Sequence, residues 1–189
     1  HYAAFFCFGS LAAAALLSWY HNYSRVLCAA LVVGLVVWGL GRAAPISDVT
    51  KLGAAFLLPL NFILLATLRE RGLTTLDGLT KLGIIGVQVA VLYRLTESGS
   101  ERLSAFLGLR DQALAWSWMP WSAHLLFAVT ALFLITFMLF RQTNVEAGLL
   151  WALATVFVGL NQVGDQGALY LYCGGAGMVL VFSILEHGF

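Results

Sequence analysis

The most restrictive feature of this chain is a series of apolar runs, each about as long as an α-helix needs to cross a hydrocarbon core of roughly 30 Å. Stretches such as LAAAALL, AALVVGLVV and LFLITFMLF are apolar on every face, whereas a barrel strand alternates with period two. A helix satisfies its own backbone hydrogen bonds in lipid. The runs therefore predict transmembrane helices.

Composition supports the same environment, because 61% of the residues are hydrophobic and only 10% are charged. The formal net charge is only +1, whereas nucleic-acid-binding proteins carry clustered positive charge, so nucleic acid is not an expected partner. Cys7, Cys28 and Cys173 lie in separate apolar runs without CxxC spacing. We expect buried free thiols.

The predicted fold class is an all-α integral membrane protein, one polytopic domain over residues 1–189. The connections between runs are short and polar, so consecutive helices should be antiparallel neighbours. The seven expected spans are Ala3–Trp19, Val26–Leu40, Leu52–Leu68, Leu79–Leu95, Trp121–Phe140, Ala147–Val163 and Ala168–Leu185.

Residues 97–118 differ from the spans, because Leu103, Phe106 and Leu107 recur at helical spacing opposite charged residues. This pattern predicts an interfacial amphipathic helix. Indoles favour the headgroup level, so the tryptophans that close the segment are expected to be interface anchors, with an aromatic cage for a ligand as the alternative. These tryptophans are Trp116, Trp118 and Trp121.

Two polar side chains are expected at membrane depth, where polar groups are costly and become candidates for function. Asn61 follows Pro59 in LLPLNFILL, and this proline should bend its helix. Gln88 lies in the middle of IIGVQVAVL. The two amides are expected either to join helices or to line a small polar pocket together.

A second candidate ligand site lies at the outer end of the predicted bundle, where the last two spans connect. Its polar residues would converge with the aromatic segment, although solvated loop residues are the simpler interpretation. The candidate residues are Arg94, His124, Asn161 and Asp165. The predicted topology separates the four histidines, so no haem, metal or other cofactor is expected in this region.

The last run contains the glycine-dense stretch CGGAG. Gly174, Gly175 and Gly177 allow close approach of backbones, which favours either tight packing within one bundle or a dimer seam. No phosphate-binding loop is present, because GxxxxGK[ST] is absent.

Two stretches, LLPLNFILLATLRERGLTT and the terminal VLVFSILEHGF, carry a resemblance to a known family. They resemble the amino-terminal membrane region of bacterial GGDEF-type diguanylate cyclases, in which a multi-span sensor leads into a cytoplasmic domain that makes cyclic di-GMP from GTP. The resemblance implies a sensory and dimerisation domain in the bacterial inner membrane, with a homodimer, a lipid or small-molecule signal, and a cytoplasmic carboxyl terminus. GTP and Mg²⁺ would belong to the output domain, because no catalytic residue of that family occurs here.

The alternative is a small self-contained membrane transporter or lipid-phase enzyme. Orientation follows weakly from charge, because the ten Lys and Arg residues divide evenly between the two predicted faces. The short loops alone favour one face as cytoplasmic. The basic residues on that face are Arg25, Arg69, Arg71, Lys81 and Arg141.

Seven spans and this charge pattern predict a cytoplasmic carboxyl terminus. An alkaline phosphatase fused at Phe189 should be inactive, whereas a fluorescent protein fused there should be bright. Thr75→Cys in a cysteine-free background should be protected from a membrane-impermeant thiol reagent in intact cells. Phosphatase activity at Phe189, or labelling of the cysteine, would reverse the orientation.

Overall fold

Every regular element in the computed structural model is helical, within the residues that it describes: 1–42, 50–51, 53–68, 72, 75–97, 119–162 and 164–188. The helices in chain order are α1 (Tyr2–Tyr20), α2 (Ser24–Arg42), the π-helix η1 (Gly53–Leu57), α4 (Leu58–Thr67), α5 (Leu76–Glu97), α7 (Trp121–Arg141), α8 (Asn144–Asn161) and α9 (Gln166–Gly188). The proposed amphipathic segment 97–118 lies outside the described residues apart from Glu97, where α5 ends.

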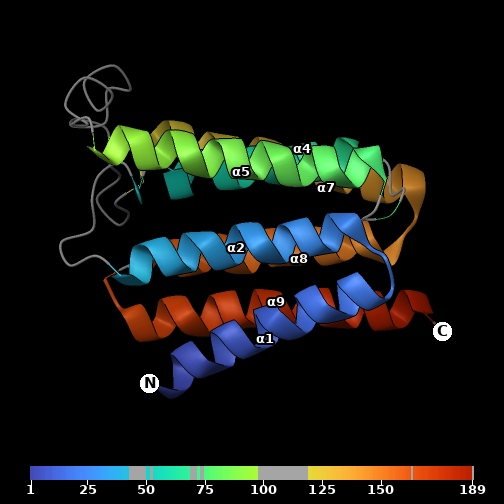
Figure 1. Cartoon of the computed structure of the whole chain (residues 1–189), viewed down its shortest axis with the longest axis horizontal. Coiled ribbons are helices and arrows are strands. Elements are labelled where there is room, and N and C mark those ends of the chain that lie inside the picture. Colours follow the sequence, from blue (N-terminus) through green and yellow to red (C-terminus); the bar gives the residue numbers. More distant parts are fainter. Residues whose placement is uncertain are drawn as a thin grey trace.

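Six of the described helices are long and apolar enough to cross a membrane, and the segment Gly53–Thr67 is apolar but shorter. The protein is therefore an all-α protein of the membrane-spanning kind. The two termini lie at opposite ends of the bundle (Figure 1). The segment of η1 and α4 lies alongside the long helices in the same bundle.

The helices form three layers (Figure 1). The middle layer consists of α2 and α8, whose apolar windows are the most buried of the six long helices. One outer layer contains α4, α5 and α7, and the other contains α1 and α9. Helix α5 is the least buried of the long helices and packs mainly on α2. Both outer layers therefore pack on the middle layer.

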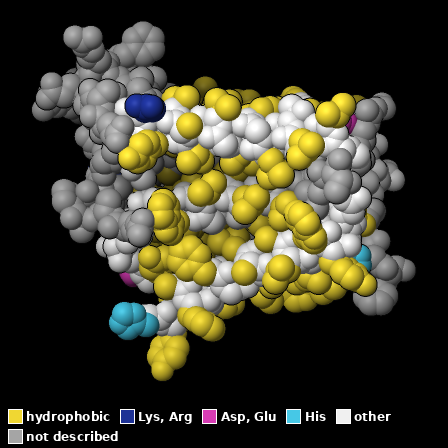
Figure 2. All heavy atoms as spheres, in the orientation of Figure 1, with side chains coloured by type: hydrophobic (Ala, Val, Ile, Leu, Met, Phe, Trp, Pro, Cys, Tyr) yellow, Lys and Arg dark blue, Asp and Glu magenta, His cyan; other side chains and the backbone are white. Residues whose placement is uncertain are grey.

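The outward surface is apolar along the middle of the bundle, and the charged and histidine side chains visible in Figure 2 lie near its ends. Large aromatic side chains are exposed close to the helix ends, as expected where indole and phenol rings meet the headgroup level. At one end these are Tyr2, Trp38, Tyr93 and Trp121, and at the other Trp19, Tyr20 and Phe140. This distribution suits a protein surrounded by lipid.

Small residues bring α9 close to α1. Ser10 Oγ donates a hydrogen bond of 2.9 Å to the carbonyl of Gly174. A Cβ at Gly174 would lie 3.1 Å from the Cα of Cys7, and one at Gly177 would lie 2.9 Å from the backbone nitrogen of Leu11. Two of the three highlighted glycines therefore serve packing within the chain. A Cβ at the third, Gly175, would meet no atom within 4 Å.

The prediction of buried free thiols is confirmed for all three cysteines. Cys7 and Cys173 belong to α1 and α9, whereas Cys28 belongs to α2. All three are fully buried members of the hydrophobic core.

Replacing Gly177 by Leu should lower the free energy of unfolding by about 1–3 kcal/mol, because the new side chain would overpack the α1–α9 contact. Gly9→Leu is the matched control on the facing helix α1 and should change stability little, since a Cβ at Gly9 would meet nothing within 4 Å. Thermal unfolding of the purified protein in detergent measures both variants. Equal melting temperatures for the two would contradict the packing role of Gly177.

Candidate functional site

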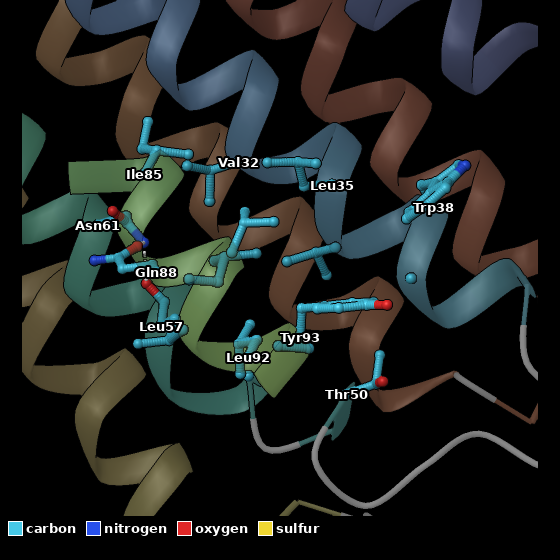
Figure 3. Close-up of a pocket in the computed structure, with 16 residues that line it drawn as sticks. Val32, Leu35, Trp38, Thr50, Leu57, Asn61, Ile85, Gln88, Leu92 and Tyr93 are labelled. Atoms are coloured by element: carbon cyan, nitrogen blue, oxygen red, sulfur yellow. Dashed lines mark hydrogen bonds between the residues drawn. The ribbon is translucent and has the colours of Figure 1, made fainter. Parts of the chain in front are cut away.

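A cavity of about 210 Å³ lies between α2, the η1–α4 segment and α5. Its walls come from Val32–Gly39, Thr50, Gly53–Asn61 and Ile85–Tyr93 (Figure 3). None of the described side chains that line it is charged. We call this cavity the amide pocket, after the two amide side chains, Asn61 and Gln88, at one end of it.

The structure brings together Asn61 and Gln88, the two polar residues expected at membrane depth. Asn61 Nδ2 donates to Gln88 Oε1 at 2.7 Å and to the carbonyl of Leu57 at 2.7 Å. Both N–H groups of the Asn61 amide are thereby used. Asn61 is 3% exposed and Gln88 is partly buried. The remaining donor and acceptor of the pair are Gln88 Nε2 and Asn61 Oδ1, which make no further hydrogen bond within the described part of the chain.

The local sequence explains why this pocket forms beside η1. Pro59 has no N–H to donate, which disturbs the regular hydrogen-bond ladder and favours a π turn in the preceding residues. Gly53 allows α5 to approach this turn, because a Cβ there would lie 2.9 Å from Leu92 Cδ1. The kink expected at the proline thus takes the form of a wider helical turn, with Asn61 holding the carbonyl of Leu57.

The pocket opens sideways between α2 and α5. Leu35, Trp38, Val89 and Tyr93 line it and are also exposed on the surface of the bundle. In Figure 3 Trp38, Tyr93 and Thr50 lie away from the amide pair, toward the other end of the cavity. An apolar molecule dissolved in a bilayer would therefore reach the cavity without crossing water.

A buried ionic cluster lies at the end of the bundle where α2 and α8 begin and where α4 and α7 end. Arg25 is 4% exposed and Glu146 is fully buried. Glu146 Oε1 accepts hydrogen bonds from Arg25 Nη1 at 2.8 Å and Arg141 Nη1 at 3.3 Å. Arg25 Nε donates to the carbonyl of Leu65 at 2.6 Å, and Arg141 Nη1 donates to that of Ala66 at 2.8 Å.

The two arginines of the cluster donate hydrogen bonds to carbonyls at the carboxyl-terminal end of α4. The last carbonyls of a helix have no partner within the helix and carry partial negative charge. Lys81 adds a further cation at this end, fully buried, with its Nζ donating to Ser24 Oγ at 2.7 Å. Sequence reasoning missed this site. From the sequence, three of its basic residues indicated only the orientation of the chain in the membrane: Arg25, Lys81 and Arg141. Glu146 was expected in a polar connection between two spans.

The second predicted site, at the opposite end, involves four separate helix ends. Asp165 Oδ1 accepts from the backbone N–H groups of Gly167 at 2.8 Å and Ala168 at 3.2 Å, and so caps the start of α9. Asn161 Nδ2 donates to the carbonyl of Phe157 in its own helix at 2.8 Å. The observed roles of both residues are local ones.

The other two residues of this group also lie near helix ends. His124 Nδ1 lies 3.1 Å from the carbonyl of Pro120, and its ring meets Phe157 edge-on. Arg94 is exposed in the last turn of α5. Among the predicted anchors, Trp121 is 58% exposed at the start of α7, whereas Trp116 and Trp118 lie outside the described residues. The described part of the chain contains no group of three or more His, Cys, Asp or Glu residues that could hold a metal ion.

No protein-family model matches the chain, and neither does any curated protein or any solved structure.

Replacing Glu146 by Leu should lower the free energy of unfolding by about 3–5 kcal/mol, because Arg25 would remain buried without its carboxylate partner. Glu186→Leu is the matched control, since Glu186 is exposed on α9 at the same end of the bundle. The double variant Arg25→Leu/Glu146→Leu should recover part of the loss. Unfolding in detergent measures all three variants, and a Glu146→Leu protein as stable as the control would disprove the role of the cluster.

Proposed function

We propose that this chain is a membrane-embedded sensory and dimerisation domain of the bacterial inner membrane. It binds a lipid or other small molecule in the amide pocket and regulates a cytoplasmic output domain attached after α9. The proposed output is synthesis of cyclic di-GMP from GTP and Mg²⁺ by a GGDEF-type catalytic domain. This assignment follows the sequence resemblance, and the geometry of α2 supports it.

The observation that carries the proposal is the position of α2 between the pocket and α9. One side of α2, from Val32 to Gly39, lines the amide pocket. Two residues further on, Gly41 contacts the side chain of Tyr170 near the start of α9. A ligand that moves α2 would therefore shift its contact with α9, and packed helices tend to occupy discrete arrangements that a ligand can bias.

Helix α9 also offers a surface for a second copy of the chain. Leu171, Met178 and Phe182 are exposed on the same face as Gly175. Gly175 has room for a close neighbour, because nothing in the described chain lies within 4 Å of a Cβ there. In a homodimer built on this face, a small shift of α9 would change the spacing of two attached catalytic domains.

The test uses the full-length protein and measures cyclic di-GMP in cells. Gly41→Leu should change its level several-fold at unchanged protein abundance in the membrane, because the larger side chain separates α2 from Tyr170. Gly9→Leu is the matched control, since a Cβ at Gly9 would meet nothing within 4 Å. Disulfide crosslinking of Met178→Cys in a cysteine-free background reports on the dimer in the same membranes.

Cyclic di-GMP levels that are the same for Gly41→Leu and Gly9→Leu would contradict coupling through α2. A coding sequence without a catalytic domain after Phe189 would sink the proposed output and favour the self-contained transporter or enzyme.

A further inference from the structure

We infer that the amide pocket binds an uncharged ring compound that carries a hydrogen-bonding oxygen at each end, of the quinone or quinol class. The inference rests on the proposed function in one respect, since it names the class of ligand that the sensor detects. Binding itself is independent of any output.

The absence of charge on the described lining side chains selects an uncharged ligand. A buried ion without a partner is strongly disfavoured in an apolar site, so carboxylates, phosphates and amines are poor candidates. The mouth between α2 and α5 is formed by exposed apolar and aromatic residues, among them Leu35, Trp38 and Val89. The ligand therefore partitions into the bilayer first and enters from its side.

Polar groups at both ends of the cavity distinguish a ring compound from a simple acyl chain. The amide pair lies at one end, and the hydroxyl group of Tyr93 lies toward the other (Figure 3). Gln88 and Tyr93 are five residues apart on α5, which corresponds to about 7.5 Å along the helix axis.

If an acyl chain filled this space, its terminal methyl group would lie against the amides. Gln88 Nε2 would then have no hydrogen-bond partner. Oxygen atoms on opposite sides of one ring could instead accept from Gln88 Nε2 at one end and from a hydroxyl group at the other. The quinol form could donate to Asn61 Oδ1. Either form can hydrogen-bond to the amide pair, whereas a hydrocarbon cannot.

The size of the cavity agrees with a single ring. An engineered apolar cavity of about 150 Å³ accommodates benzene, so the volume of about 210 Å³ accommodates a substituted six-membered ring. A macrocycle would not fit. A hydrocarbon tail attached to the ring would leave through the open side, past Trp38 and Val89, into the surrounding lipid.

The experiment measures equilibrium binding of a radiolabelled benzoquinone with a ten-carbon tail. The wild-type protein is placed in phosphatidylcholine nanodiscs, and empty nanodiscs give the background from partitioning. We expect saturable binding that excess unlabelled quinone displaces. Decanol, which has the tail without the ring, should not displace it. Displacement by decanol at equal concentration would overturn the ring assignment in favour of an acyl chain.

Two pairs of variants locate the site. Gln88→Leu should weaken binding by about fivefold to tenfold, the loss expected for one hydrogen bond. Its control is Thr136→Val, which removes an exposed hydroxyl bonded to its own helix. Val89→Phe should block the mouth and abolish saturable binding, whereas Val91→Phe should not, because Val91 is similarly exposed on α5 but does not line the pocket.

The result separates this inference from the proposed function. Absence of saturable binding by the folded wild-type protein would overturn the quinone assignment, even if Gly41→Leu still altered cyclic di-GMP. Equal binding by the Val89→Phe and Val91→Phe variants would overturn the assignment to this pocket. Quinone binding that is lost in Val89→Phe would support the inference, even if the coupling through α2 failed its own test.

Discussion

The structure depends on the requirement that a helix surrounded by lipid must satisfy its own backbone hydrogen bonds. Most of the helices meet this requirement by being long and regular. The segment of η1 and α4 is less regular, because Pro59 has no N–H to donate and the residues before it form a π-helix. Side chains donate hydrogen bonds to carbonyls near both ends of α4. Asn61 serves the carbonyl of Leu57, and Arg25 and Arg141 serve those of Leu65 and Ala66.

This compensation explains why charged residues are buried at one end of the bundle. Two arginines held at the end of α4 need a counter-charge once they leave water, and Glu146 supplies it from the start of α8. The cluster therefore connects α2, α4, α7 and α8 around the carboxyl-terminal end of α4. The outer layer of α1 and α9 is held differently, by the close approach of small residues and by the hydrogen bond from Ser10 Oγ to the carbonyl of Gly174.

Sequence patterns predicted the helices well, because membrane spans are determined by length and hydropathy, which are local properties. The polar residues Asn61 and Gln88 were also identifiable, since a single amide in an apolar run is conspicuous. Their proximity agrees with the expectation that consecutive spans are neighbours, whereas the hydrogen bond between them was found only in the structure. Glu146 was not identifiable in this way. It lies in a polar connection, and its burial arises only when four helix ends that are distant in sequence converge.

The candidate site at the other end of the bundle shows the converse problem, in which residues that are close in sequence suggest a shared ligand site. Asp165 and Asn161 attracted attention because they gather near one turn, yet their observed bonds cap α9 and join α8 to itself. Proximity in sequence cannot distinguish a residue that ends a helix from one that meets a ligand. The rest of that prediction involves Trp116 and Trp118, which lie outside the described residues.

The amide pocket and the π-helix η1 lie beside the same proline. Pro59 interrupts the regular ladder, the preceding residues widen into a π turn, and the side chains before it are as small as Gly53 and Ala54. Small side chains beside a widened turn leave space that α5 does not fill, because α5 packs mainly on α2. The one polar side chain that stabilises the turn, Asn61, then lies at the edge of that space and meets Gln88. A cavity with a polar end in an otherwise apolar bundle is thus a direct consequence of one proline in a membrane helix.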